Sequence, residues 1–352
     1  MQKKIIALAV AGLVSGAAFA QSNVTIYGVA DAYYGHLSAT GNQSVNAINS
    51  GGLSGSRLGF RGNEDLGGGL KAVFEYELAF NLDNTGTSNA AINSTGAGNG
   101  ITGTRQSYVG LSSATMGTVV LGRLQTPGYY IGKFDALASS TISPQAILSG
   151  NLGATINPGN NGRVNNAAAY ISPTFGGFSA VAAYGFGEEN VQSAEEESVF
   201  GLGLNYAAGP FAISYVHHSI DNVGANNTAA GVAPDRRENM IGASYDLGMV
   251  KILGNWQDVK TGNNDDSMWQ LGAVAPIGKG NLHFAYGKTS RDVNSSDAKS
   301  WTLAYTYGLS KRTTLYTGYN RTTNDRLQTA GILAPTAGGS SKALVAGLRH
   351  TF

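Results

Sequence analysis

The sequence predicts an all-β protein: a 16-stranded antiparallel transmembrane β-barrel whose third external loop folds inward. Three observations support this fold class. Apolar residues alternate with small or polar residues over many segments of about ten residues, and short and long connections alternate between those segments. One connection, 125–163, is 39 residues long and rich in Gly, Ser, Asn and Pro, and loops of that length in a compact domain are usually functional.

The alternation is clearest in four segments, where apolar side chains occupy one parity. These side chains are Phe74, Tyr76 and Leu78; Phe200, Leu202 and Leu204; Leu282, Phe284 and Tyr286; and Trp301, Leu303 and Tyr305. Because successive side chains of a strand point to opposite faces, this period of two indicates amphipathic strands. A soluble β-sandwich or propeller would also alternate. It is disfavoured because aromatic residues recur at strand ends and the other parity is small and rich in glycine.

Connections of two kinds join these strands. Seven short turns fall at 66–69, 115–118, 174–177, 207–210, 246–249, 277–280 and 309–312, and eight longer polar loops at 38–54, 83–103, 125–163, 188–197, 221–236, 261–266, 292–298 and 325–341. Fifteen connections join 16 strands. Both chain ends fall on the short-turn side, so the first and last strands can pair and close the sheet. This arrangement is typical of outer-membrane barrels, and at 16 strands the interior holds a water channel.

The N-terminus predicts export. Lys3 and Lys4 precede an apolar core at 5–14, and an AFA motif predicts cleavage after Ala20, so that 1–20 is a signal peptide and 21–352 the barrel. Removing two lysines changes the formal charge from +1 to −1, because 21 basic residues then face 22 acidic ones.

This composition excludes several classes of function. A near-neutral chain lacks the basic footprint of a nucleic-acid-binding protein. The chain has no Cys, which excludes disulfides and thiolate metal sites. No run of about 18 apolar residues follows the signal peptide, which excludes helical membrane spans.

Several stretches resemble the Gram-negative general diffusion porins, in particular their neisserial and burkholderial branch. These stretches are 23–31 (NVTIYGVAD), 56–67 (SRLGFRGNEDLG), 105–111 (RQSYVGL), 121–123 (LGR), 305–313 (YTYGLSKRT) with Tyr316, and 347–352 (GLRHTF). The resemblance spans the whole mature chain. It implies a homotrimer in the Gram-negative outer membrane, in which each barrel passes small hydrophilic solutes and ions through a channel that the third external loop constricts.

Two further partners follow from the resemblance and from the loops. Phe352 resembles the C-terminal signal read by the barrel-assembly machinery, with Leu344 and Leu348 on the same lipid-facing side, and His350 stands where an apolar residue or Tyr is more usual. The acidic run 195–197 lies in an external loop. It is either a solvated tip or a bridge, through divalent cations, to lipopolysaccharide phosphates.

Strand parity predicts which charges line the channel. If Leu58 faces lipid, its neighbour Arg57 faces the lumen. If Tyr108 faces lipid, Arg105 faces the lumen three residues earlier. Glu75 lies between two outward aromatic residues and is therefore also inward.

In the family that the chain resembles, arginines matching Arg57, Arg105 and Arg163 form a basic cluster on the wall, and acids of the constriction loop face it. Here Asp135 is the only acid between 125 and 163, and Lys133 is its only basic residue besides Arg163.

The acidic half of the field would therefore reduce to Asp135 and Glu75. Unopposed arginines between low-dielectric walls attract anions, so we expect a mild anion preference. Arg123 is a further candidate whose parity is less clear. The alternative for each of these basic residues is a solvated wall position that pairs with a neighbouring acid.

Other motifs predict no catalysis, cofactor or metal. His217 and His218 are adjacent strand residues and point to opposite faces, and none of the five His residues lies in a nucleophile motif. An enzyme is therefore disfavoured, and an adhesin would not need an inward loop lined by basic residues. A porin specific for anions such as phosphate or organic acids remains an alternative, and saturable block by its solute would identify it.

Overall fold

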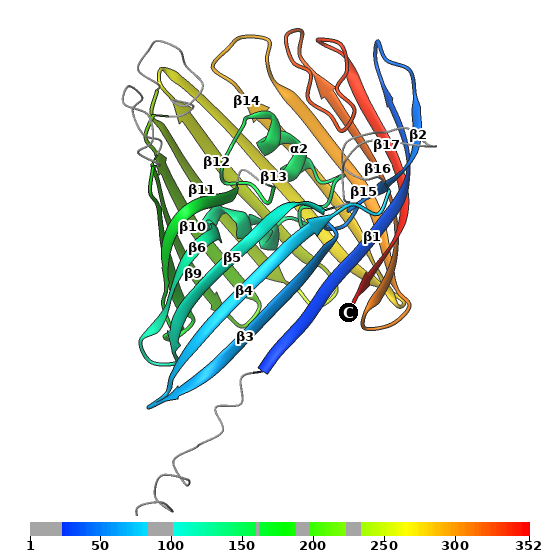
Figure 1. Ribbon diagram of the computed structural model, residues 1–352. Coiled ribbons are helices and arrows are strands. Elements are labelled where there is room, and N and C mark those ends of the chain that lie inside the picture. The colour runs from blue at the N-terminus through cyan, green and yellow to red at the C-terminus, as the bar shows by residue number, and fades with distance from the viewer. Residues whose placement is uncertain (1–22, 84–100, 160–161, 188–197, 223–233) are drawn as a thin grey trace, which may run out of the picture.

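The computed structural model describes residues 23–83, 101–159, 162–187, 198–222 and 234–352. The predicted signal peptide at 1–20 and the acidic run at 195–197 lie outside these residues. Tilted strands form a single barrel, and the described residues of the loop between Gln125 and Arg163 lie inside it (Figure 1). Among the described residues, no helix is long and apolar enough to cross a membrane.

All strand pairs of the sheet are antiparallel, and the last strand pairs with the first. The strands are β1 (Asn23–Ala39), β2 (Val45–Ser50), β3 (Arg57–Gly67), β4 (Leu70–Phe80), β5 (Ile101–Ser113), β6 (Gly117–Gln125), β7 (Arg163–Ile171), β8 (Phe178–Gly185), β9 (Val199–Ala208), β10 (Phe211–Ile220), β11 (Arg236–Asp246), β12 (Lys251–Thr261), β13 (Asn264–Ile277), β14 (Gly280–Ser290), β15 (Ala298–Gly308), β16 (Thr313–Asn324) and β17 (Ser340–Thr351).

Two of these segments, β2 and β3, form one barrel strand. Both pair with β1, with Ser50 opposite Ala32 and Arg57 opposite Val29, and the chain between them, 51–56, leaves the ladder. The barrel therefore has 16 strands, and the predicted fold class is confirmed.

The structure differs from the predicted boundaries at two loops. The expected loop 38–54 contains strand β2, whose side chains continue the pairing with β1. The expected loop 261–266 is a two-residue turn, because β12 and β13 pair as far as Thr261 and Asn264. Gly262 permits this turn, since its φ of +57° is in the left-handed region that glycine adopts readily.

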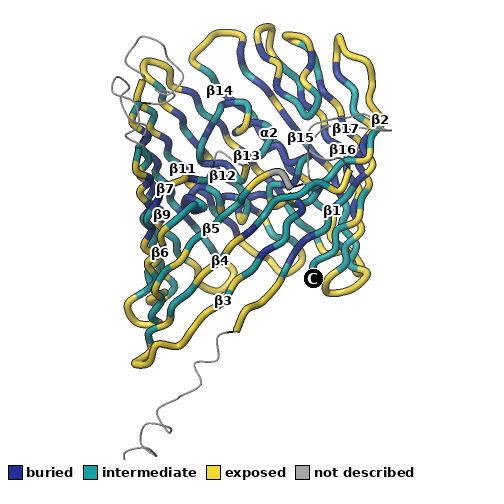
Figure 2. Tube along the Cα trace, in the orientation of Figure 1, coloured by how far each residue is buried: buried dark blue, intermediate teal, exposed yellow. Residues whose placement is uncertain are grey.

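Side chains alternate between a lipid-facing and a lumen-facing side of the wall, and Figure 2 shows exposed and buried positions alternating along the strands. Large apolar residues such as Trp256, Leu303 and Leu344 are exposed on the outer face. Such a surface is suited to lipid rather than to water.

The constriction loop, 125–163, carries the 3₁₀ helix η1 (Pro127–Phe134) and the helix α2 (Pro144–Asn151). Ser143 begins α2, because its hydroxyl accepts from the backbone N–H of Ala146. Helix η1 packs against β8 to β12 and α2 against β13 to β15, so the loop covers one side of the inner wall. The predicted inward fold of this loop is confirmed.

Small residues on the inner wall make room for the loop. A Cβ on Gly242 would collide with the Phe134 ring, and one on Gly318 would collide with Ile142. Phe134 and Ile142 are at most 3% exposed, and burying each such side chain contributes about 1.5–3 kcal/mol. The small, Gly-rich parity of the strands is therefore the surface on which the loop packs.

Buried polar side chains attach the loop to the wall. Glu238, which is fully buried on β11, accepts from the backbone N–H groups of Thr155 and Ile156 at 2.9 and 2.8 Å. His218 on β10 accepts from the N–H of Gly128 at 3.2 Å, and its other ring nitrogen lies 2.9 Å from the hydroxyl of Thr155. The loop is thus held at both its start and its end.

Candidate functional site: the channel constriction

One carboxylate on β4 binds two of the predicted arginines. The Nε of Arg105 donates to Glu77 Oε1, and the Nε of Arg57 lies 3.4 Å from Glu77 Oε2. The Glu77 side chain is only 6% exposed, whereas that of Arg57 is 23% exposed to the channel. Glu77 therefore neutralises one guanidinium and leaves the pair with a net positive charge.

Tyr129 of the constriction loop joins this pair to Arg163. Its hydroxyl accepts from Arg105 Nη2 at 2.8 Å and from Arg163 Nη2 at 3.1 Å. The Arg163 guanidinium also lies 4.7 Å from the centre of the Tyr129 ring, within the range of a cation–π contact. The structure thus brings Arg57, Arg105 and Arg163 together on one side of the channel.

Glu75 lines the same wall on the periplasmic side of Glu77. It accepts from the Tyr27 hydroxyl at 2.7 Å and from the Tyr108 hydroxyl at 3.2 Å, and the amide of Gln106 also donates to it. These donors are neutral, so they hold the carboxylate in place without cancelling its charge.

Tyr108 faces the lumen, and its expected lipid-facing orientation is wrong. It lies opposite Glu75 in the ladder and donates to it. Arg105 faces the lumen for a different reason from the predicted one. The register shifts between Gln106 and Thr104, so a β-bulge at Arg105 turns it to the same side as Gln106.

Asp135 does not face the channel, so its predicted role is also wrong. It is 3% exposed and accepts from the backbone N–H groups of Leu137 and Ser139, the hydroxyl of Ser143 and the amide of Gln270. Burial raises the pKa of Asp135 above its ordinary value, and these hydrogen bonds oppose only part of that rise. The reason is local: the turn after η1 leaves backbone donors that need an acceptor. Among the described residues, the acids that contact this site are the wall residues Glu75 and Glu77.

The remaining two candidates bind elsewhere. Lys133 is exposed at the end of η1, and its Nζ donates to Asn205 on β9. The Nε of Arg123 donates to the Thr104 carbonyl at 2.9 Å, and its Nη1 donates to Asn165. Neither side chain joins the contacts around Glu77 and Tyr129.

Sequence reasoning missed three residues of this site. Glu77 could have been found from the sequence, because it has the same strand parity as Glu75 and because two lumen-facing arginines require a counter-ion nearby. Tyr129 and Tyr130 carried no such signal, because their orientation depends on the path of the loop. Tyr130 is 54% exposed and packs edge-on against Tyr129 at 5.7 Å.

A cavity of about 330 Å³ lies between the constriction loop and the turns at the periplasmic end of β14 to β17. None of its lining residues is acidic. Its basic lining residues are Lys279, His283 and Arg349, and its apolar lining residues include Leu53, Leu137 and Ile142. The volume is that of a small-molecule site.

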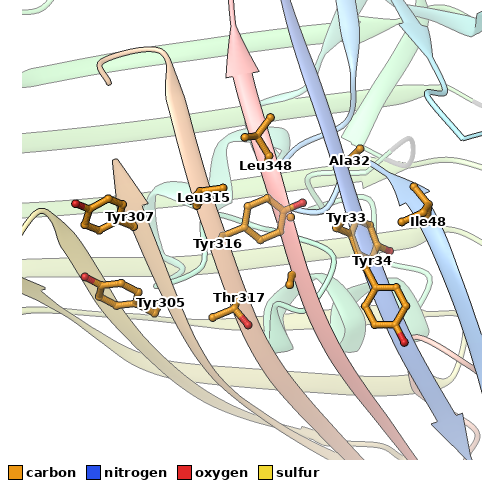
Figure 3. Close-up of a pocket in the computed structure, with 12 residues that line it drawn as sticks. Ala32, Tyr33, Tyr34, Ile48, Tyr305, Tyr307, Leu315, Tyr316, Thr317 and Leu348 are labelled. Carbon is orange, nitrogen blue, oxygen red and sulfur yellow. The ribbon is translucent and has the colours of Figure 1, made fainter. Parts of the chain in front are cut away.

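A second hollow lies on the outer face of β1, β2 and β15 to β17 and is not part of the channel (Figure 3). Tyr34, Ile48 and Leu348, each more than two-fifths exposed, contribute to its apolar lining. The described residues include no cluster of three His, Asp or Glu side chains that could hold a metal ion.

Comparisons with known proteins agree with this architecture. The family model described as Gram-negative porin matches residues 7–327. Outer membrane porin protein 32 of Delftia acidovorans is 34% identical over 371 residues, covering 100% of both chains, and an outer membrane porin protein of Bordetella pertussis is 27% identical over 410 residues, again covering 100% of both. The solved structure of an anion-selective porin from Comamonas acidovorans has a TM-score of 0.80 and 31% identity, covering 94% of this chain and 100% of that chain. The chain therefore belongs to the Gram-negative porin family and forms a channel in the outer membrane.

Proposed function

We propose that this channel lets small hydrophilic solutes and ions diffuse passively and that it mildly prefers anions. The observation that carries the preference is the cluster of Arg57, Arg105 and Arg163, in which Glu77 forms ion pairs with the first two. With Glu75 included, three guanidiniums face two carboxylates. A net positive charge in a narrow aqueous passage concentrates anions. The anion-selective relative from Comamonas acidovorans supports the same preference.

The sign of the reversal potential tests this proposal. In a planar bilayer with a tenfold KCl gradient, the purified protein is expected to give a reversal potential with the sign of a chloride-selective channel. The preference should weaken as the salt concentration rises, because the Debye length falls from about 10 Å at 0.1 M to about 3 Å at 1 M. A reversal potential with the sign of a potassium-selective channel at low salt would show that Glu75 or the external loops determine the electric field in the channel.

A narrower function, in which the porin is specific for organic anions, is the second candidate. The cavity beneath the constriction loop favours it, because Arg349 and Lys279 could bind a carboxylate while Leu53 and Leu137 contact an apolar body. The Nε of Arg349 is buried there without a hydrogen-bond partner.

Addition of succinate on the periplasmic side is then expected to reduce the ionic current saturably. Arg349→Gln should raise the half-saturating concentration about tenfold, the effect of losing a charge-assisted hydrogen bond. Arg312→Gln, which changes an exposed residue of the neighbouring turn, is the matched control. A current that falls linearly with succinate in both wild type and variant would leave only the general channel.

We further propose that residues 1–20 direct export, that the chain has no catalytic activity and that three copies assemble.

The apolar outer hollow in Figure 3 supports assembly, because side chains of a second copy could fill it. Phe352 is 47% exposed beside Gly28 at the barrel rim, where the barrel-assembly machinery could read it. Native mass spectrometry of the detergent-solubilised protein would show the number of copies.

A further inference from the structure

We propose that four basic side chains on the outer wall form a binding site for the phosphate groups of lipopolysaccharide. These residues, Lys288, Lys299, Arg321 and Lys342, are named here the outer basic patch. They lie on four consecutive strands, β14 to β17, near the ends that lead into the long loops. The inference rests on the outer-membrane location of the protein and not on its ion preference.

The four side chains share the lipid-facing side of the wall. Lys299, Arg321 and Lys342 are exposed and alternate with buried lumen-facing neighbours such as Ser300 and Thr322. Lys288 is half-buried, with a side chain that is 36% exposed. The patch is therefore separated from the channel by the barrel wall.

Like charges face each other directly within this patch. Lys288 is the ladder partner of Lys299, and Arg321 is the ladder partner of Lys342. Side chains at such positions have Cβ atoms about 4.5–5.5 Å apart, and like charges directly opposite destabilise a sheet. Asp297, 3.5 Å from Lys288, is the acid in ion-pair contact with the patch within the described part of the chain. Four cations and one carboxylate leave a strong local excess that a multivalent anion would relieve.

Aromatic side chains place the patch at the level of the lipid headgroups. The Trp301 ring lies 5.4 Å from the Tyr319 ring, and the Trp269 ring 5.6 Å from the Tyr286 ring. The two Trp residues are ladder partners of Arg321 and Lys288, and the two Tyr residues lie two positions nearer the barrel centre on the strands of those partners. Trp and Tyr gather where the hydrocarbon of a membrane meets its polar surface. Lys and Arg just beyond such a belt can reach lipid phosphates while their stems remain beside apolar groups.

The opposite ends of the same strands carry no Lys or Arg on the outer face. There the outward positions of β14 to β17 carry apolar or neutral side chains and one histidine: Leu282, Phe284, Leu303, Tyr305, Tyr307, Leu315, Thr317, Ala346, Leu348 and His350. Short turns follow these ends, which places them on the periplasmic side. The excess of positive charge therefore faces the outer leaflet alone, where the lipid carries several phosphates per molecule.

Binding of defined lipids to the purified protein tests this site. In lipopolysaccharide-free micelles, quenching of Trp fluorescence is expected to report binding of diphosphorylated lipid A, because Trp301 lies beside the patch. Lys299→Gln with Arg321→Gln should weaken this binding at least about tenfold, whereas Lys311→Gln in a periplasmic turn should leave it unchanged. Equal affinity of the double variant, equal binding of dephosphorylated lipid A, or equal occupancy by inorganic phosphate alone would each overturn the proposal.

The thermal unfolding temperature gives an independent test, because the variant is expected to be more stable without lipopolysaccharide but to gain less stability when it is added. Without lipopolysaccharide, Arg321→Gln is expected to raise the unfolding temperature because it removes repulsion from Lys342. Addition of lipopolysaccharide should raise the unfolding temperature of the wild type more than that of the variant. A variant that is destabilised without lipid and gains as much from lipid as the wild type would contradict the site. The reversal potential is expected to stay at its wild-type value, which separates this inference from the proposed anion preference.

Discussion

Replacing Arg57 and Arg105 together with serine is expected to reverse the ion preference of the channel. Both guanidiniums contact Glu77, which would then lose its counter-ions while remaining on the lumen wall beside Glu75. Of the three clustered guanidiniums, only that of Arg163 would then remain near the two carboxylates. Two unit charges 4 Å apart in water interact by about 1 kcal/mol, which changes a local ion concentration about fivefold per charge. The reversal potential under a KCl gradient should therefore change sign, from that of a chloride-selective channel to that of a potassium-selective channel.

The matched control is the double lysine variant, Arg57→Lys with Arg105→Lys. It keeps the charge but removes the planar guanidinium that can bond Glu77 and Tyr129 at the same time. This variant should keep the chloride sign, although its single-channel current should be less steady. If the double serine variant keeps the wild-type chloride preference, the arginine cluster does not select ions. The field would then come from residues such as Lys133 or Arg349.

The barrel was predictable because every strand faces two different environments. Residues such as Phe74 and Tyr76 must face lipid, so the parity of β4 and its neighbours follows from composition alone. The interruption at 51–56 could not be predicted in the same way. It depends on a carboxylate, Asp31, that lies on a different strand and whose partners are backbone groups without a sequence signal.

The site was predictable where the ladder is regular. The ladder between β3 and β4 is regular from Arg57 to Asp65, and the lumen-facing positions of Arg57 and Glu75 follow from its alternation. Arg105 lies at a bulge, where the alternation fails, and the inference through Tyr108 was therefore wrong although Arg105 does face the lumen. Asp135 lies in a loop without a period, so its sequence position could not show whether it faces the channel or the wall.

Asp31→Ala is expected to loosen the constriction without unfolding the barrel. The carboxylate is fully buried and accepts from the backbone N–H groups of Gly52, Leu53 and Ser54 at 2.9–3.1 Å, and from the Tyr316 hydroxyl. Alanine would leave four donors without this acceptor, and a buried donor that loses its partner costs about 1–3 kcal/mol. The N–H of Gly52 and the hydroxyl of Tyr316 are buried, and the N–H groups of Leu53 and Ser54 are partly buried. The ladder between β1 and β17 does not depend on this side chain, so the loss is local.

The segment 51–56 transmits this loss to the channel. Its carbonyls at Gly51 and Gly52 accept from the hydroxyl and the N–H of Thr141 in the constriction loop, at 3.0 and 2.9 Å. Its Gly55 carbonyl accepts from Arg57 Nη1 at 3.0 Å. Release of the segment would therefore free the loop at Thr141 and change the position of Arg57 together.

Single-channel recording tests whether the constriction is loosened, and circular dichroism tests whether the barrel remains folded. Asp31→Ala should give currents that switch between several levels and an anion preference weaker than that of the wild type, with an unchanged β-sheet spectrum. Asp246→Ala is the matched control, because Asp246 also accepts from a backbone N–H, that of Gly248 at 2.8 Å, but in an exposed periplasmic turn. Steady wild-type currents in Asp31→Ala would show that the wall contacts of η1 and α2 suffice to fix the constriction. In that case the loop would be held by apolar packing against glycines such as Gly242 and Gly318, and the carboxylate would serve only the strand break at 51–56.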